Sequence, residues 1–440
     1  MHTTKKHGLK ADYSYNGVMR RIIKKIIPAP VFKLLQPYYH YLLALIGATI
    51  YRNPSKDLCV IGITGTKGKS STTEIVRHLL HDSGKKVASL STIQFSIDGK
   101  TERNLFKMTM PGRFFVQKFL RDAVAAGCTH AVIEMTSEGA KQYRHKFISI
   151  DALVFTNLTP EHIESHGSFK KYKAAKLLLA EAVASSNKRP RYIVANVDDE
   201  HGQDFLKSPV ENLLPYSLNN LSLHTLHKDS MSLVLEGMTI RVPLIGLFNV
   251  YNVLAAITLV RALGVSLETV QNSLQNLPTI AGRVEKFTSP IEADKKVSVF
   301  VDYAHTPDSL EQLYKAFPEQ TKICVLGNTG GGRDTWKRPE MAAIAEKYCE
   351  HIFLTNEDPY DENPQKIISE MKAGIEDKEK LTIEMDRRTA IEKAIEFAPT
   401  ESVVLVSGKG TDPYIMGPDG TREIWSDSQV VKESLKKILG

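Results

Sequence analysis

The feature that most constrains this 440-residue chain is the glycine-rich stretch GITGTKGKSS at residues 62–71. An apolar, β-prone run precedes it at residues 58–61, and residues 72–80 carry apolar side chains at helical spacing. The predicted order is strand, loop, helix. A loop with few Cβ atoms lets backbone N–H groups close around phosphate oxygens, and the helix adds the positive end of its dipole. The stretch therefore predicts a nucleotide-phosphate site.

Two side chains of this loop are predicted to make the main contacts to phosphate and Mg²⁺. Lys69 is placed to meet the β- and γ-phosphates, and the Ser70 hydroxyl to hold Mg²⁺. Gly62 stands one residue too early for the strict spacing, so the pattern is T-G-T-x-G-K-S, and a plain turn is the alternative. The predicted nucleotide-binding residues of the loop are Gly65, Thr66, Lys67, Gly68, Lys69, Ser70 and Ser71.

Charge is distributed unevenly along the chain. The formal net charge is +7, but residues 1–56 hold ten Lys or Arg against one Asp, which leaves 47 basic and 49 acidic residues elsewhere. The body is therefore slightly acidic, and we expect no nucleic-acid partner. With 42% hydrophobic and 24% charged residues, the composition is that of a globular chain of two or three domains.

The four cysteines, at positions 59, 128, 324 and 349, show no paired spacing. We expect them to be isolated from one another and structural, in a cytoplasmic protein.

A basic and then apolar segment occupies residues 20–51. Pro28, Pro30 and Pro37 are expected to break any single long helix, and the apolar part, residues 38–51, is shorter than the ~20 residues that span a bilayer. Two interpretations stay open. One is a helix packed on the next domain, which is the commoner case. The other is an interfacial anchor at the inner face of the membrane, with lysines and arginines on anionic lipid.

Strands and helices alternate through the rest of the chain. Predicted strands at residues 58–61, 87–90, 129–135, 152–157 and 192–197 belong to one block, and residues 206–243 to an antiparallel flank. A helix follows at residues 248–263. Strands at residues 297–301, 322–326, 351–354 and 402–406 form a second block.

This alternation predicts an α/β fold. We expect a short helical N-terminal arm (1–52), a central domain of P-loop ATPase type with a mostly parallel sheet (53–281), and a C-terminal Rossmann-like doubly wound domain (282–440).

Polar side chains follow several of these strands, at the sheet edge where α/β proteins bind ligands. Glu134 ends the strand at 129–135 and is a candidate Mg²⁺ ligand. His162 lies on the loop after the next strand and is a candidate for a second metal site, although a loop histidine is more often simply exposed. In the second block, polar loops follow three strands, at residues 302–308, 327–334 and 407–410. Three such loops on one edge indicate a binding face.

Two helices carry further candidates. Asn249 and Asn252 share one helix face, where their amides suit an adenine edge, with helix capping at Asn249 as the alternative. The helix at residues 171–177 carries several lysines, which composition alone assigns to a solvated face.

Nine motifs, in this order, resemble the ATP-dependent Mur ligases, and within them the enzymes that add the third residue to UDP-N-acetylmuramoyl-dipeptide. The resemblance runs from residue 53 to 440. The motifs are TGTKGKSST, VIEMTSEG, VFTNLTPEHIESHGSFKKYKAAK, GLFNVYNVLAA, GRVE, VDYAHTPDSLEQL, GNTGGGRDTWKRPEMAAIAE, TNEDPYDENP and SGKGTDPY.

The resemblance implies ATP, two Mg²⁺ sites and amide formation through an acyl phosphate, with a cell-wall precursor peptide and an amino acid as small-molecule substrates and a monomeric enzyme. It implies catalytic roles for Lys69, Lys176, His162 and Arg283. Metal ligands would be Ser70, Glu134, His162 and a carbamylated Lys176. Nucleotide contacts would be Asn249, Asn252, Arg283, Asp302 and His305. Substrate contacts would be Thr109, Ser137, Arg144, Glu357, Asp358, Pro359, Tyr360, Gly408, Lys409 and Asp412.

Two departures limit the resemblance. Only about 50 residues precede the loop, which is too few for the family's N-terminal uridine-binding domain. The helix followed by a strand at this point of the chain resembles instead the folylpolyglutamate synthetases, relatives that also lack that domain. Tyr360 stands where diaminopimelate-adding enzymes carry arginine, so we expect lysine or another diamino or neutral amino acid to be preferred. The alternatives are a folylpolyglutamate- or polyglutamate-type ligase, and a catalytically silent membrane or scaffold protein.

Overall fold

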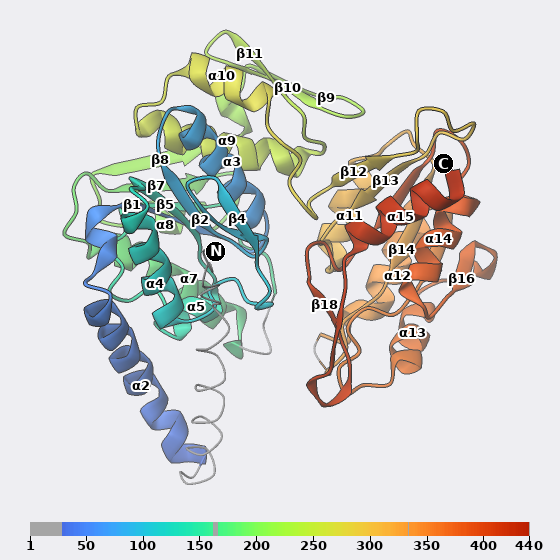
Figure 1. Cartoon of the computed structure of the whole chain (residues 1–440), viewed down its shortest axis with the longest axis horizontal. Coiled ribbons are helices and arrows are strands. Elements are labelled where there is room, and N and C mark those ends of the chain that lie inside the picture. The colour runs from blue at the N-terminus through green and yellow to red at the C-terminus, as the bar shows by residue number, and fades with distance from the viewer. Residues whose placement is uncertain (1–28, 162–165, 333, 440) are drawn as a thin grey trace, which may run out of the picture.

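The computed structural model describes residues 29–161, 166–332 and 334–439. Figure 1 shows two lobes side by side, each a sheet with helices on its faces. We call the part from α2 to α10 the first lobe and the part from β12 to α15 the second lobe.

The first lobe is built on an eight-stranded sheet of order β4-β3-β2-β5-β1-β6-β7-β8 and carries a three-stranded antiparallel sheet, β11-β10-β9. Its elements are α2 (Ala29–Ile50), η1 (Pro54–Asp57), β1 (Cys59–Thr64), α3 (Lys69–Asp82), β2 (Val87–Leu90), β3 (Gln94–Ile97), β4 (Lys100–Arg103), α4 (Arg113–Ala125), β5 (His130–Glu134), α5 (Ser137–Lys141), β6 (Ala152–Phe155), α7 (Phe169–Ala184), β7 (Tyr192–Asn196), α8 (Gly202–Phe205), β8 (Asn212–Tyr216), η2 (Leu218–Asn220), β9 (Leu223–Leu226), β10 (Met231–Leu235), β11 (Met238–Val242), α9 (Leu247–Ala262) and α10 (Leu267–Gln275).

The second lobe is built on a six-stranded sheet of order β12-β13-β17-β14-β15-β16, with a small β18-β19 ribbon. Its elements are β12 (Glu285–Thr288), β13 (Ser298–Val301), α11 (Pro307–Lys315), β14 (Lys322–Leu326), α12 (Lys337–Tyr348), β15 (His351–Leu354), α13 (Pro364–Lys372), η3 (Lys378–Lys380), β16 (Leu381–Ile383), α14 (Arg387–Phe397), β17 (Val403–Val406), β18 (Tyr414–Met416), η4 (Pro418–Gly420), β19 (Arg422–Ile424) and α15 (Asp427–Leu439).

Strand β1 lies at the centre of the first sheet and fixes where the chemistry gathers. It pairs in parallel with β5 and β6, with Ile63 opposite Glu134 and Thr64 opposite Phe155. These strands are apolar on both faces and buried on both, one face under α3, α9 and α10 and the other under α4 and α7. The carboxyl ends of three neighbouring strands therefore meet at the loop that leads into α3.

The main sequence predictions of strands and helices are confirmed, and the α/β class with them. Strands β2, β14 and β15 have the predicted bounds, and the antiparallel flank appears as β9 to β11. The prediction of an antiparallel flank is wrong for its first strand, because β8 extends the main sheet in parallel with β7. No clear sequence pattern predicts the hairpin strands β3 and β4 or the edge strands β12 and β16, because these strands are short and partly exposed.

The prediction that prolines break the N-terminal segment is wrong at Pro30 and Pro37, because α2 runs through both. Pro30 is in the first turn, where a missing N–H costs nothing, and the helix tolerates the loss of one bond at Pro37. The later half of α2 packs on α4 through buried Ala44 and Ala48, as the packed-helix interpretation required. Among the described residues, no helix is both long and apolar enough to cross a membrane.

The expectation of four isolated cysteines is also wrong for one pair. Cys324 in β14 and Cys349 after α12 form a disulfide across a sequence separation of 25 residues. Such a separation gives no sequence signal, because the strand and the helix end are brought together only by packing. Cysteine usage therefore gives no argument for a reducing compartment. Cys59 and Cys128 are free, and burial raises the pKa of Cys59 to about 12.

Candidate active site

The glycine-rich loop between β1 and α3 is held in place by hydrogen bonds from its backbone N–H groups. The Thr66 N–H donates to the carbonyl of Asn157 (2.8 Å), and the Lys67 N–H donates to the Asn157 side chain (2.9 Å). Gly68 has φ +78°, and a Cβ there would collide with the Asn252 side-chain oxygen. Only glycine meets both the left-handed backbone and the close approach of α9. The loop is thus held in one shape before any ligand arrives.

Three basic side chains converge on this loop. Lys69 Nζ donates to the Thr66 carbonyl (2.7 Å), and Lys176 Nζ in α7 donates to the Gly65 carbonyl (2.6 Å). Arg283, at the start of the second lobe, donates to Ser70 Oγ (3.2 Å) and stacks over the Tyr303 ring (4.7 Å). These hydrogen bonds all go to neutral oxygens, so the charges of Lys69 and Arg283 are left for an anion.

Lys176 is the most unusual of the three. It is 2% exposed, and burial lowers its pKa well below the ordinary value, with the charge of Lys69 adding to the effect. Both effects favour the uncharged amine. An uncharged, buried amine is a nucleophile rather than a surface cation, so the solvated-face expectation for this helix fails at position 176.

Oxygen ligands for a cation lie beside these positive groups. Glu134, at the end of β5, is 2% exposed, and its Oε2 accepts hydrogen bonds from Ser70 Oγ (3.0 Å) and the Thr92 N–H (2.8 Å). A hydroxyl and a carboxylate fit Mg²⁺, which prefers hard oxygen ligands. No cluster of three or more His, Cys, Asp or Glu suited to a metal occurs within the described ranges. His162 lies outside the described residues.

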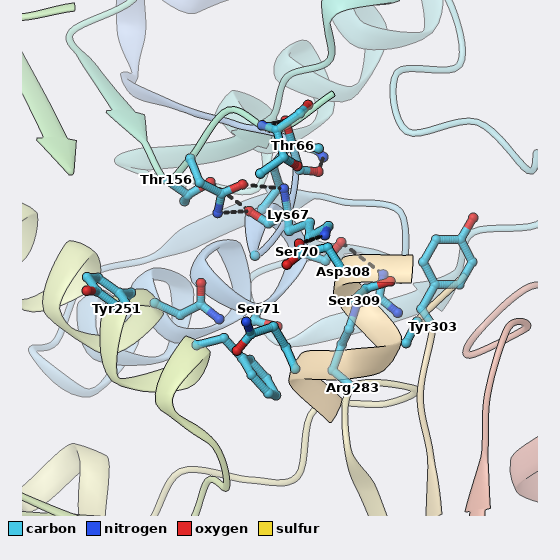
Figure 2. A pocket seen from close by; sticks show the side chains of 18 of the residues that line it. Thr66, Lys67, Ser70, Ser71, Thr156, Tyr251, Arg283, Tyr303, Asp308 and Ser309 are labelled. Atoms are coloured by element: carbon cyan, nitrogen blue, oxygen red, sulfur yellow. Dashed lines mark hydrogen bonds and ion pairs between the residues drawn. The ribbon is translucent and has the colours of Figure 1, made fainter. Parts of the chain in front are cut away.

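The second lobe closes the site from the other side. Asp308, at the start of α11, pairs with Lys67, and His305 Nε2 lies 3.4 Å from Glu161 Oε1. Asp302 accepts the N–H groups of Val284 and Ala304 (2.8 and 2.7 Å), and its burial raises its pKa. Figure 2 shows Arg283 and Asp308 pointing across toward Lys67 and Ser70.

A cavity of about 560 Å³ lies between the lobes, a volume typical of small-molecule sites. The structure brings most of the predicted nucleotide and metal residues to its wall, and with them Thr109 from the predicted substrate contacts. These nucleotide and metal residues are Thr66, Lys67, Gly68, Lys69, Ser70, Ser71, Glu134, Asn252, Arg283, Asp302 and His305. Gly65, Lys176 and Asn249 lie just behind it. The capping alternative for Asn249 is wrong, because Gly246 caps α9 and the Asn249 side chain bonds Asn252 and the Ile245 carbonyl.

The other predicted substrate residues form two further groups. Ser137, the first residue of α5, bonds His166 (3.1 Å), and Arg144 donates to the Met110 carbonyl and to Gln142. In the second lobe the loops after β15 and β17 lie together. They contribute Glu357, Asp358, Pro359, Tyr360, Gly408, Lys409 and Asp412.

Sequence reasoning missed several lining residues. Asp198 and Asp199 follow β7 directly, so the same strand-end rule that selected Glu134 applies to them. Tyr251, which donates to Asp198 Oδ2 (3.1 Å), lies between the two chosen asparagines. Thr92 comes from the turn between β2 and β3 and had no recognisable signal. The whole arrangement offers anion-binding cations, hard oxygen groups suited to Mg²⁺ and a second group of polar loops, which suits phosphoryl transfer followed by capture of an amine.

Comparison with known families accounts for most of the chain. Residues 63–260 match the family described as the Mur ligase middle domain, and residues 282–410 match the Mur ligase, glutamate ligase domain.

Individual relatives agree with this match. A UDP-N-acetylmuramoyl-L-alanyl-D-glutamate--2,6-diaminopimelate ligase from Halalkalibacterium halodurans is 33% identical over 90% of this chain and 82% of its own length. A solved structure of an enzyme with that name has a TM-score of 0.59 and 28% identity, covering 86% of this chain and 78% of its own. The folylpolyglutamate synthase of Mycobacterium tuberculosis has a TM-score of 0.66 over 84% and 92%, but at 16% identity it shows the fold alone.

The glycine geometry gives a matched test of the loop. We expect Gly68→Ala to weaken binding of ATP at least ~10-fold, because the new Cβ collides with Asn252 in addition to straining the left-handed backbone. Gly84→Ala carries the same kind of strain, with φ +84°, and nothing within 4 Å. Calorimetric titration with ATP measures both. Equal losses in the two variants would show that the loop is not a nucleotide site.

Proposed function

This chain belongs to the Mur ligase family, and we propose that it uses ATP to join an amino acid to the peptide carboxylate of UDP-N-acetylmuramoyl-L-alanyl-D-glutamate. Its relatives carry the name of that reaction with diaminopimelate as the amino acid. The observation that best supports the proposal is the convergence of Lys69, Lys176 and Arg283 on one preformed loop between the lobes. In this scheme residues 53–281 hold ATP, and residues 282–440 hold the incoming amino acid.

The mechanism follows from why a carboxylate resists an amine at neutral pH. Oxide is a poor leaving group, so a carboxylate oxygen of the acceptor first attacks the γ-phosphorus of ATP, and the bond to the departing ADP breaks. The amine then attacks the acyl phosphate, the carbon–oxygen bond breaks, and phosphate leaves with the electron pair. Lys69 and Arg283 stabilise charge on the transferring group, while the lobes hold the reactants in line.

Two Mg²⁺ ions would neutralise phosphate charge during this step. Ser70 and Glu134 would hold one of them. For the second we propose Lys176 after reaction with CO₂: its amine forms an N–C bond, gives up a proton, and becomes a carbamate with two oxygens. The buried, uncharged amine favours this reaction. His162 remains a proposed ligand beside it.

For the amino acid we propose lysine or another amino acid without a distal carboxylate. Tyr360 ends the loop at residues 357–360, and a phenol cannot make the two parallel hydrogen bonds that an arginine makes to a carboxylate.

The exposed side of α2 supports a further proposal, peripheral contact with an anionic membrane. Ala44 and Ala48 face α4, whereas the opposite face exposes Leu35, Tyr38, Tyr39, Leu42, Leu45, Ile46 and Ile50. Figure 1 shows α2 extending away from the body of the first lobe. In the sequence, residues 1–28 hold seven Lys or Arg against one Asp. A basic run followed by an exposed apolar face matches the chemistry of an anionic lipid surface.

The central prediction is acceptor-dependent ATP consumption. With UDP-N-acetylmuramoyl-L-alanyl-D-glutamate and a panel of amino acids, we expect phosphate release to be faster with lysine than with diaminopimelate. Lys69→Ala should lower the rate at least ~100-fold, since it removes a charge that stabilises the transferring phosphoryl group. Lys85→Ala, an exposed lysine beyond the far end of α3, serves as control. Preference for diaminopimelate would overturn the amino-acid proposal, and no ATP use with any peptide acceptor would overturn the function.

Lys176 gives a second prediction. Lys176→Ala should lose nearly all activity, and added acetate should restore part of it by supplying the missing carboxylate oxygens. The parent enzyme should slow when bicarbonate is removed and recover when it is returned. Because carbamate formation needs the uncharged amine, acidification should also reduce the carbamylated fraction, which ¹³C NMR with labelled bicarbonate measures. No labelled carbamate in an active enzyme would contradict this role.

The membrane proposal predicts co-sedimentation with vesicles. We expect the full chain to pellet with vesicles containing anionic lipid and much less with neutral vesicles, and high salt to reduce binding. Deleting residues 1–37 should abolish the effect. In the full chain, Leu42→Glu with Ile46→Glu should weaken it while leaving the basic run intact. Unchanged sedimentation and unchanged ligase activity after the deletion would end the proposal, and binding to another protein instead of vesicles would replace it.

A further inference from the structure

A second set of charges joins the two lobes, separate from the contacts at the glycine-rich loop. Lys107 belongs to the first lobe, on the segment between β4 and α4. Its Nζ lies 2.5 Å from Asp358 Oδ2 and 3.1 Å from Asp412 Oδ2, both in the second lobe. It also lies 5.8 Å from the centre of the Tyr360 ring. One side chain thus contacts both loops of the proposed amino-acid pocket.

The buried carboxylate of Asp358 relies on Lys107 to pair with one of its two oxygens. It is 2% exposed, and its Oδ1 accepts hydrogen bonds from Lys409 Nζ (2.8 Å) and the Met416 N–H (2.8 Å). Lys409 is fully buried and also donates to the Tyr414 carbonyl (2.6 Å). The second lobe thus satisfies one oxygen of Asp358, and Lys107 satisfies the other from across the interface. Burial opposes ionisation of Asp358, but the two lysines outweigh it and hold its pKa below the ordinary value.

The segment that carries Lys107 also reaches the residues proposed to hold Mg²⁺. Two residues further along, Thr109 Oγ1 bonds Thr92 Oγ1 (2.8 Å), and the Thr92 N–H donates to Glu134 Oε2 (2.8 Å). Glu134 is the carboxylate that accepts Ser70 Oγ. A short series of contacts therefore connects the amino-acid loops to the residues proposed to handle phosphate and Mg²⁺.

Arg103, at the end of β4, reinforces the same junction. Its guanidinium donates to the carbonyls of Thr411, Asp412 and Trp425 (3.1, 3.2 and 3.2 Å). The backbone of Asp412 is thus held by Arg103, and its side chain by Lys107. The loop after β17 is fixed relative to the first lobe at two points.

We propose that Lys107 is a positioning residue that holds the amino-acid loops over the acyl phosphate, so that the amine rather than water reaches the acyl carbon. The proposal rests on the ligase function proposed above. Attack by the amine forms a C–N bond, releases phosphate, and gives a proton to solvent. Attack by water returns the acid and also releases phosphate. The two outcomes consume the same ATP and differ only in whether an amide appears.

This difference supplies a direct test, the ratio of phosphate released to amide formed. We expect a ratio near one in the parent. Lys107→Met should raise the ratio several-fold and raise the KM for the amino acid about 10-fold, with the KM for ATP within 2-fold. Lys107→Arg should keep the ratio near one, because it preserves the charge. Lys86→Met is the matched control, since Lys86 pairs with Asp98 within the first lobe (3.3 Å).

Asp412→Asn tests the partner. Alone it should raise the ratio, and combined with Lys107→Met it should add little, because the contact between Lys107 and Asp412 is already lost in Lys107→Met. Circular dichroism and the KM for ATP check that each variant is folded. A Lys107→Met enzyme with the parent's ratio and amino-acid KM would overturn the proposal, as would equal increases in both KM values. A parent that consumes no ATP with any acceptor would instead overturn the ligase function itself.

Discussion

Positive charge without a matching carboxylate is the constraint on which the site depends. Lys69, Lys176 and Arg283 come from α3, α7 and the start of the second lobe, yet each donates its hydrogen bonds to a carbonyl or a hydroxyl. Lys69 and Arg283 carry like charges that repel at one loop, whereas burial and the charge of Lys69 favour the uncharged form of Lys176. A polyphosphate removes that cost on binding, whereas an apolar or cationic ligand increases it. The charge of the site thus favours a polyanionic ligand independently of the ligand's shape.

The two lobes come together through polar contacts, most of them pairs of opposite charge. Lys67 meets Asp308 and Glu161 meets His305 near the phosphate loop, and Lys107 meets Asp358 and Asp412 at the amino-acid loops. Polar interfaces of this kind separate more readily than apolar ones. Within the second lobe, by contrast, the buried Arg387–Asp427 pair (2.7 Å) is internal and also holds the carbonyl of Ser407. Rigid loops on a separable interface suit an enzyme that admits three substrates.

The sequence predicted the phosphate loop and its strand–loop–helix context because those depend on local features, glycine at Gly65 and Gly68 and apolar periodicity around them. It also predicted Glu134, since a strand end in a parallel sheet is a fixed position. It failed at Pro37 and at the Cys324–Cys349 disulfide. In both cases the outcome depended on context and packing that no local pattern records. Lys176 entered only through the family resemblance. His162 was a candidate from its place after a strand, and it lies outside the described residues.

By itself the sequence determined the fold class, the glycine-rich loop between a strand and a helix, and the family, because spacing and periodicity are properties of neighbouring residues. Only the tertiary structure decided what those residues become. It buried Lys176 beside Lys69 and so changed its preferred charge state, and it carried Lys107 across to Asp358, 251 residues away. The physical reason is that pKa and ion pairing depend on distance and solvent exposure, and these are set when distant segments pack together.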